Sequence, residues 1–245
     1  MRSQYARRVR PTGQIVGRPA SLGRRVHAMT QRETTPLTLS LSRLSITAVT
    51  CLCCFVILAL AVAHSRGPYG FEETVSTWLG APSSAATWAN LAELLTTPVI
   101  AAVLVISVTF GIAKRALFRV VVYGGLATTA FLLSEHVAKP LIDRSYFGEL
   151  TFPSGSVTAV SATVLAMCLA FYPLLGKRER VGMLVIGGTW TFVTALAVVG
   201  ALWHTPLDDV GSILLSTGVV TGGSALFETA AARGAKTGAG RPKIG

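Results

Sequence analysis

The sequence predicts an all-α protein, a transmembrane bundle of six helices with both termini in the cytoplasm. Of its 245 residues, 51% are hydrophobic and only 13% are charged, whereas soluble domains carry about 25% charged residues. The apolar residues gather in six long runs, and most cations lie in segments that such a bundle would place on one side of a membrane. These three observations together indicate an integral membrane protein.

The chain begins with a basic segment. Residues 1–43 contain nine arginines and one acid, Glu33. Because Pro, Gly, Ser and Thr are interspersed and the hydrophobic periodicity is weak, we expect a disordered tail that lies near anionic lipid. Binding of nucleic acid is an alternative that we do not favour, since no aromatic interleaving or motif supports it. Met29 is an alternative start of the chain.

Six apolar segments are expected to cross the membrane, namely 44–63, 97–113, 120–136, 157–175, 181–202 and 210–227. The first has 20 residues without a charge, enough to cross about 30 Å of hydrocarbon. Because further spans follow, we interpret it as an uncleaved anchor and not as a signal peptide. Residues 44–228 form the predicted membrane domain, and 229–245 form a basic C-terminal tail.

Residues 64–96 separate the first two spans and have a mixed composition. Phe71, Val75 and Trp78 recur at helical spacing, with acids between them. A similar pattern surrounds Trp88. We expect one or two short amphipathic helices at the membrane interface, with both tryptophans in the aromatic belt.

The distribution of cations predicts the orientation. With the N-terminus in the cytoplasm and six crossings, 19 of the 22 Lys and Arg residues fall on the cytoplasmic side. Only Arg66, Lys139 and Arg144 remain on the outer side. This asymmetry follows the positive-inside rule, and it predicts that the polar clusters after the third span face outward.

The first two polar clusters have the chemistry of an anion site. Lys139 and Arg144 follow the third span, and the fork of an Arg suits a phosphate. Residues 153–156 read Pro-Ser-Gly-Ser and open the fourth span. A glycine there lets a ligand approach the backbone, and the free N–H groups of a helix start attract phosphate. Alternatively, Ser154 or Ser156 is an ordinary helix cap.

The third cluster pairs a histidine with a carboxylate. His204 and Asp208 are four residues apart at the junction of the last two spans, so they share one face if the segment is helical. A carboxylate bonded to one imidazole nitrogen leaves the other free as a base or nucleophile. Alternatively, Asp208 or Asp209 caps the sixth helix.

No metal or cofactor is predicted. The four cysteines lie in apolar runs and are expected to be buried, small hydrophobic residues. A zinc site lacks a third ligand at suitable spacing, although His136 leaves this alternative open.

In these motifs and their order, residues 45–228 resemble the type 2 phosphatidic acid phosphatases, a superfamily of membrane lipid phosphate phosphatases. The family pattern is Lys and Arg, then Pro-Ser-Gly-His, then Ser-Arg, five residues, His, three residues, Asp. The resemblance implies that His204 attacks phosphorus and that Asp208 orients it. It also implies that phosphate is bound by Lys139, Arg144, Ser154, Gly155 and Ser156.

Three positions depart from the family pattern. Tyr146 stands where the first motif has its Arg, so Arg144 must replace it. Ser156 stands where the second motif has its His, the expected general acid. Val198 stands where the third motif has a phosphate-binding Arg. His136 is an alternative proton donor.

These departures leave competing functions. The first is hydrolysis of a lipid or polyprenyl phosphate or diphosphate on the outer face of a bacterial cytoplasmic membrane. The second is a catalytically weakened or inactive relative that binds a phosphorylated lipid or a protein partner. A small transporter is a third, but the spans show neither an internal repeat nor a pair of broken helices. Membrane lipids are expected partners, nucleic acid is not, and the oligomeric state is not predicted.

Overall fold

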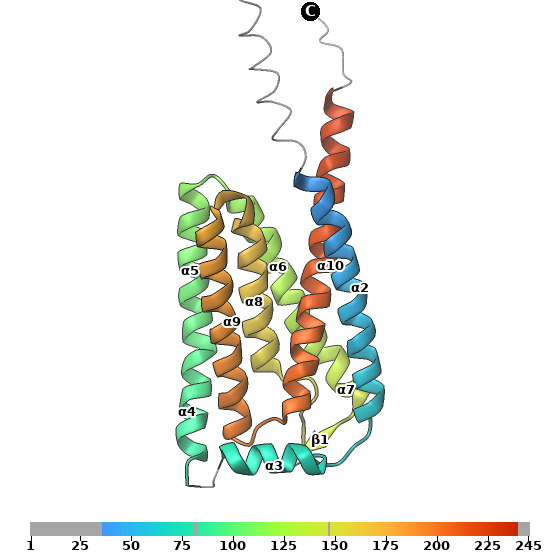
Figure 1. The fold of residues 1–245 in the computed structure, drawn as a ribbon, viewed down its shortest axis with the longest axis vertical. Helices are drawn as coiled ribbons and strands as arrows, with labels where there is room; N and C mark the ends of the chain where they lie inside the picture. Colours follow the sequence, from blue (N-terminus) through green and yellow to red (C-terminus); the bar gives the residue numbers. More distant parts are fainter. Residues whose placement is uncertain (1–35, 81–82, 147, 240–245) are drawn as a thin grey trace, which may run out of the picture. The chain divides into compact units, whose positions relative to one another are not determined.

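The computed structural model describes residues 36–80, 83–146 and 148–239. The predicted tail residues 1–35 and the last residues, 240–245, lie outside this range. The described chain is helical apart from one two-stranded hairpin (Figure 1), which confirms the all-α class. Its elements are α2 (Pro36–Val62), α3 (Gly70–Leu79), α4 (Ala85–Leu95), α5 (Thr97–Ala113), α6 (Leu117–Leu133), the π-helical turn η1 (Ser134–Ala138), α7 (Lys139–Ile142), β1 (Ser145–Tyr146), β2 (Glu149–Leu150), α8 (Gly155–Phe171), the 3-10 turn η2 (Tyr172–Leu174), α9 (Lys177–Gly200) and α10 (Pro206–Ala239).

Six segments of the described chain are long and apolar enough to cross a membrane, which confirms the six-span prediction. They are Leu41–Val62, Ala85–Ala113, Leu117–Ile142, Gly155–Leu174, Lys177–Gly200 and Pro206–Arg233. Residues 36–43 and 229–239, which belong to the two predicted tails, are helical. Residues 229–239 are rich in alanine, the strongest helix former, so nothing stops the last helix at the membrane boundary.

Helix α8 forms the centre of the bundle. It packs against α6, α9 and α10 (Figure 1), and its Ala162, Ala166 and Ala170 are completely buried. Helix association in lipid depends on close van der Waals packing, because lipid tails are as apolar as the side chains. The many Ala, Ser and Thr residues of α8 allow neighbouring helices to approach it from several sides.

Helices α4 and α5 follow each other with a break at Thr96, and together they form the second span. Residues 85–95, which we expected at the interface, thus belong to the second candidate span. The indole of Trp190 donates a 2.8 Å hydrogen bond to the carbonyl of Leu95 at this break. Trp88 is half-buried against Gly200 and donates to the carbonyl of Leu79. Packing against α9 thus holds α4 in the bundle and removes Trp88 from the expected aromatic belt.

Helix α3 lies across the ends of the other helices (Figure 1). Phe71, Val75 and Trp78 are exposed along one side of it, and Trp78 is 82% exposed. Glu72 and Ser76 are buried on the other side. The predicted amphipathic helix is present, and its polar side faces the bundle.

We predict that close packing at Gly187 of α9 is required for stability. A Cβ atom there would collide with Val164 of α8, whereas a Cβ atom at the neighbouring Gly188 meets nothing within 4 Å. Overpacking a well-packed interior costs about 1–3 kcal/mol. Gly187→Leu should therefore lower the thermal unfolding temperature in detergent, with Gly188→Leu as the matched control. Equal unfolding temperatures for the two variants would contradict this packing.

Candidate functional site

The three polar segments meet at the end of the bundle that α3 covers (Figure 1). The side chain of Arg144 contacts Asp208, which is 64 positions away in the sequence. The N–H of Ser154 donates a 3.3 Å hydrogen bond to the carbonyl oxygen of Asp208. The basic turns 114–119 and 177–180 lie at the opposite end of the bundle (Figure 1). The structure therefore joins the polar clusters and separates them from these cations.

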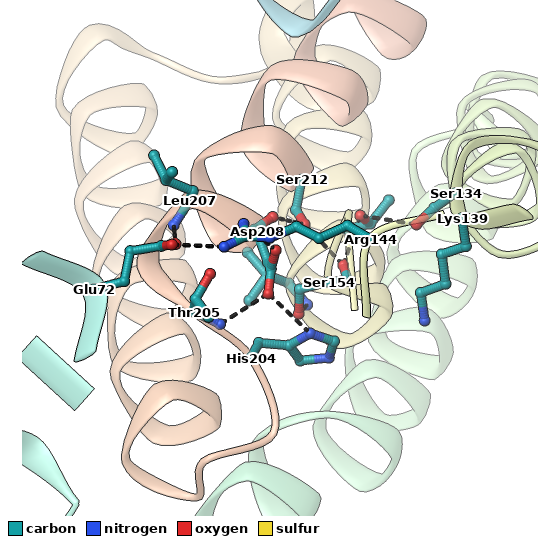
Figure 2. A network of polar contacts seen from close by, with 12 residues as sticks. Glu72, Ser134, Lys139, Arg144, Ser154, His204, Thr205, Leu207, Asp208 and Ser212 are labelled. Atoms are coloured by element: carbon teal, nitrogen blue, oxygen red, sulfur yellow. Dashed lines mark hydrogen bonds and ion pairs between the residues drawn. The ribbon is translucent and has the colours of Figure 1, made fainter. Parts of the chain in front are cut away.

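His204 and Asp208 face each other at the junction of α9 and α10 (Figure 2). His204 Nδ1 lies 3.8 Å from Asp208 Oδ2, which is within ion-pair range but longer than a hydrogen bond. Asp208 is completely buried, and its Oδ2 accepts a 2.9 Å hydrogen bond from the N–H of Thr205. The side chain of His204 is 12% exposed. The structure therefore brings the pair together, and Asp208 also bonds to the backbone just before α10.

Arg144 is bound by two carboxylates. Its Nη1 donates to Asp208 Oδ1 at 2.9 Å and its Nη2 donates to Glu72 Oε2 at 2.6 Å (Figure 2). We call Arg144, Glu72 and Asp208 the Arg144 triad. All three side chains are at most 1% exposed. We expected Arg144 to face an outer cavity, but the structure buries it, because the two carboxylates provide the negative charge that a buried guanidinium needs.

Glu72, the triad member from α3, was not predicted from the sequence. Besides Arg144, this carboxylate accepts hydrogen bonds from the N–H groups of Tyr69 and Leu207. The sequence carried one relevant signal. If the apolar side of an interfacial helix faces lipid, then the side that carries Glu72 must face the bundle.

Lys139 is paired with Glu135, four residues earlier. Its Nζ lies 2.8 Å from Oε1 and 2.9 Å from Oε2 of that carboxylate. Both side chains are partly exposed, Lys139 by 15% and Glu135 by 26%. The pair lies against Gly155, where an added Cβ atom would collide with Glu135 Oε1. His136 is exposed, and no group of three or more metal-ligating side chains occurs in the described part of the chain.

The start of α8 is built by Ser154 and Gly155, both buried. Ser154 is the N-cap residue, and its hydroxyl accepts a long hydrogen bond of 3.5 Å from the N–H of Val157. Its carbonyl oxygen accepts 2.9 Å and 2.8 Å bonds from the hydroxyls of Ser212 and Thr158. Ser156 is half-buried. Ser154 therefore caps α8, as the alternative interpretation expected, and its carbonyl oxygen also accepts a hydrogen bond from α10.

Apolar packing occupies the position of the missing phosphate-binding Arg. Ala197 and Val198 are completely buried. They cluster with Val157 of α8 and Ala92 of α4, which are also completely buried. A long cation at residue 198 would lose this packing and lie among apolar side chains, where a charge is unfavourable.

An exposed ion pair involves Asp143, the residue before Arg144. Arg66 Nη2 lies 2.8 Å from Asp143 Oδ2, and the hydrogen bond from Arg66 holds the pKa of the Asp143 carboxyl below its usual value. Tyr146, at the position of the family Arg, is half-buried, and burial followed by the charge of Glu73 raises the pKa of its phenol. An exposed pair contributes little to stability, so the buried Arg144 triad dominates the electrostatics of this region.

The chain is thus a helical membrane protein whose His204–Asp208 pair lies in a polar site at one end of the bundle. No family model and no curated protein matches this sequence. Among solved structures, the chain is similar to the crystal structure of the first transmembrane PAP2 type phosphatidylglycerolphosphate phosphatase from Bacillus subtilis. The TM-score is 0.62 and the identity 18%, over 75% of this chain and 96% of that chain. The fold is therefore that of a transmembrane PAP2-type phosphatase.

We predict that the Arg144 triad is required for stability. Removing one partner of a buried ion pair costs about 3–5 kcal/mol, because it leaves an uncompensated buried charge. Glu72→Gln should lower the unfolding temperature of the purified protein strongly. Glu73→Gln is the matched control, since Glu73 is the exposed neighbour on the same helix. Similar unfolding temperatures for both variants would contradict the role of Glu72.

Proposed function

We propose that this protein hydrolyses a lipid or polyprenyl phosphate or diphosphate through a covalent intermediate on His204. The observation that carries the proposal is the geometry of His204, which faces the buried Asp208 carboxylate with one nitrogen while its side chain keeps some exposure. The fold of a PAP2-type phosphatase supports the same reaction. Because the similar solved protein is a phosphatidylglycerolphosphate phosphatase, a phospholipid phosphate is one candidate substrate.

Each residue has a separate role in the proposed reaction. Asp208, whose Oδ2 lies 3.8 Å from Nδ1 of His204, orients the imidazole through its charge, and Nε2 is the nitrogen that attacks phosphorus. The P–N bond forms, the P–O bond to the leaving group breaks, and the leaving oxygen takes up a proton from solvent water. Water then cleaves the P–N bond and releases inorganic phosphate. In this scheme Arg144 acts mainly by fixing Asp208.

The proposed phosphate ligands are Lys139 and the start of α8, formed by Ser154, Gly155 and Ser156. The helix start supplies N–H groups that have no partner within the helix, and Lys139 supplies the positive charge. A diphosphate substrate suits this site best. Its leaving group needs little help from a general acid. This matters because Ser156 occupies the position where the family pattern has the histidine that acts as general acid.

The second candidate is a weakened or inactive relative that binds a phosphorylated lipid or a protein partner. The observation that favours it is that carboxylates pair with both predicted phosphate-binding cations, Lys139 and Arg144. Loss of a general acid costs about 10²–10⁴ in rate, and loss of one charge-stabilising donor costs about 10²–10³. Uncompensated, the two losses would leave very little turnover.

An assay of phosphate release separates the two candidates. We expect the purified protein to release phosphate from polyprenyl diphosphate faster than from polyprenyl phosphate or phosphatidic acid, because its leaving group is better. His204→Ala should abolish the release, since the variant lacks the nucleophile. Release that persists in His204→Ala would exclude this residue as nucleophile. Lipid binding without any release would favour the second candidate.

We also propose that the site faces the outside of a bacterial cytoplasmic membrane, with both termini in the cytoplasm. The separation of the site from the basic turns 114–119 and 177–180 supports this orientation, because cytoplasmic loops are enriched in Lys and Arg.

Cysteine labelling tests the orientation. In a variant without the four native cysteines, Glu149→Cys places a thiol in the exposed strand β2 at the site end. Arg178→Cys places one at the opposite end, where it is also exposed. We expect a membrane-impermeant maleimide to label Cys at 149 from the outside of intact cells and to label Cys at 178 only after lysis. The reverse pattern would overturn the proposed orientation.

A further inference from the structure

We propose that Glu135 occupies the phosphate position of the site in the free protein and thereby sets its affinity for phosphate. The proposal rests on the proposed phosphate site and identifies a residue that determines how strongly this site binds its ligand. The carboxylate of Glu135 is the group that the phosphate of a substrate must displace.

Glu135 lies in the π-helical turn η1. This turn, Ser134–Ala138, directly precedes α7, and π-helical turns occur often at functional sites. It presents Glu135 and Lys139 together against the start of α8. Glu135 Oε1 lies so close to Gly155 that a Cβ atom there would collide with it, and this Cβ atom would lie 3.6 Å from Lys139 Nζ. The space that this glycine leaves is thus taken by a carboxylate of the protein itself.

A carboxylate and a phosphate are attracted by the same two features. The first N–H groups of a helix attract anions, and the helix dipole adds a favourable positive end. Lys139 adds a full positive charge, and its Nζ lies within 2.9 Å of both oxygens of Glu135. A phosphate that binds at the α8 start would therefore compete with Glu135 for Lys139.

The charges of the site show why this competition matters. Three carboxylates, those of Glu72, Asp208 and Glu135, accompany the two cations Lys139 and Arg144. Because each of these cations already has a carboxylate partner, neither is free for an approaching anion. Glu72 and Asp208 have no exposed side-chain surface, but the side chain of Glu135 is 26% exposed. Glu135 is therefore the carboxylate that can turn away and free a cation for the ligand.

Binding of inorganic phosphate to the purified full-length protein tests the proposal. Glu135→Gln removes the competing charge and keeps the side-chain size. It should tighten phosphate binding about tenfold, which corresponds to about 1.4 kcal/mol. Glu149→Gln removes an exposed acid near the same end of the bundle and should leave the affinity close to that of the wild type. Lys139→Gln should weaken binding, because it removes the cation that both anions use.

The outcomes separate this inference from the proposed function. Phosphate binding by Glu135→Gln that is no tighter than in the wild type would overturn the inference, even if the enzyme hydrolyses lipid phosphates. Tighter binding without hydrolysis by any variant would support the inference and contradict the enzymatic function. Should Glu135→Gln unfold, Glu135→Ala in the same titration gives the second test, with the unfolding temperature of each variant as the check on its fold.

Discussion

The buried guanidinium of Arg144 is the interaction on which this end of the molecule depends. It joins the loop after α7 to Glu72 of α3 and to Asp208 of α10, which are 72 and 64 positions away. Between spans that associate through the packing of small side chains, such directional bonds fix the relative positions of three segments. The same contact holds Asp208 beside His204. The arrangement of the candidate nucleophile is therefore a consequence of a buried charge cluster.

Charge compensation also determines what the site can bind. Each cation of the predicted phosphate site already has a carboxylate partner within the chain. The two partners differ in burial, and this difference gives them different roles. Glu72 is enclosed, and it stabilises the fold by compensating Arg144. Glu135 lies at the partly exposed side of the site, where a ligand with a stronger negative charge can replace it.

The departures from the phosphatase pattern are built into the packing of the bundle. Val198 fills the place of a phosphate-binding Arg together with Val157 and Ala92, all without exposed surface. A cation at residue 198 would require several apolar side chains to move. The altered motif and the apolar cluster around it are therefore one structural feature, and restoring a single family residue does not restore the family site.

The sequence by itself determined the six spans, because the length and polarity of an apolar run are properties of neighbouring residues. It also predicted that His204 and Asp208 lie close together, although the structure places His204 in the bend before α10 and not within a helix. The partners of Arg144 were decided only by the tertiary structure, whereas Lys139 pairs with Glu135 four residues earlier. Glu72 meets Arg144 across 72 positions, and Glu135 fills the space beside Gly155 only because η1 packs against the start of α8. Such contacts depend on how distant segments approach one another, and no local pattern of residues records that.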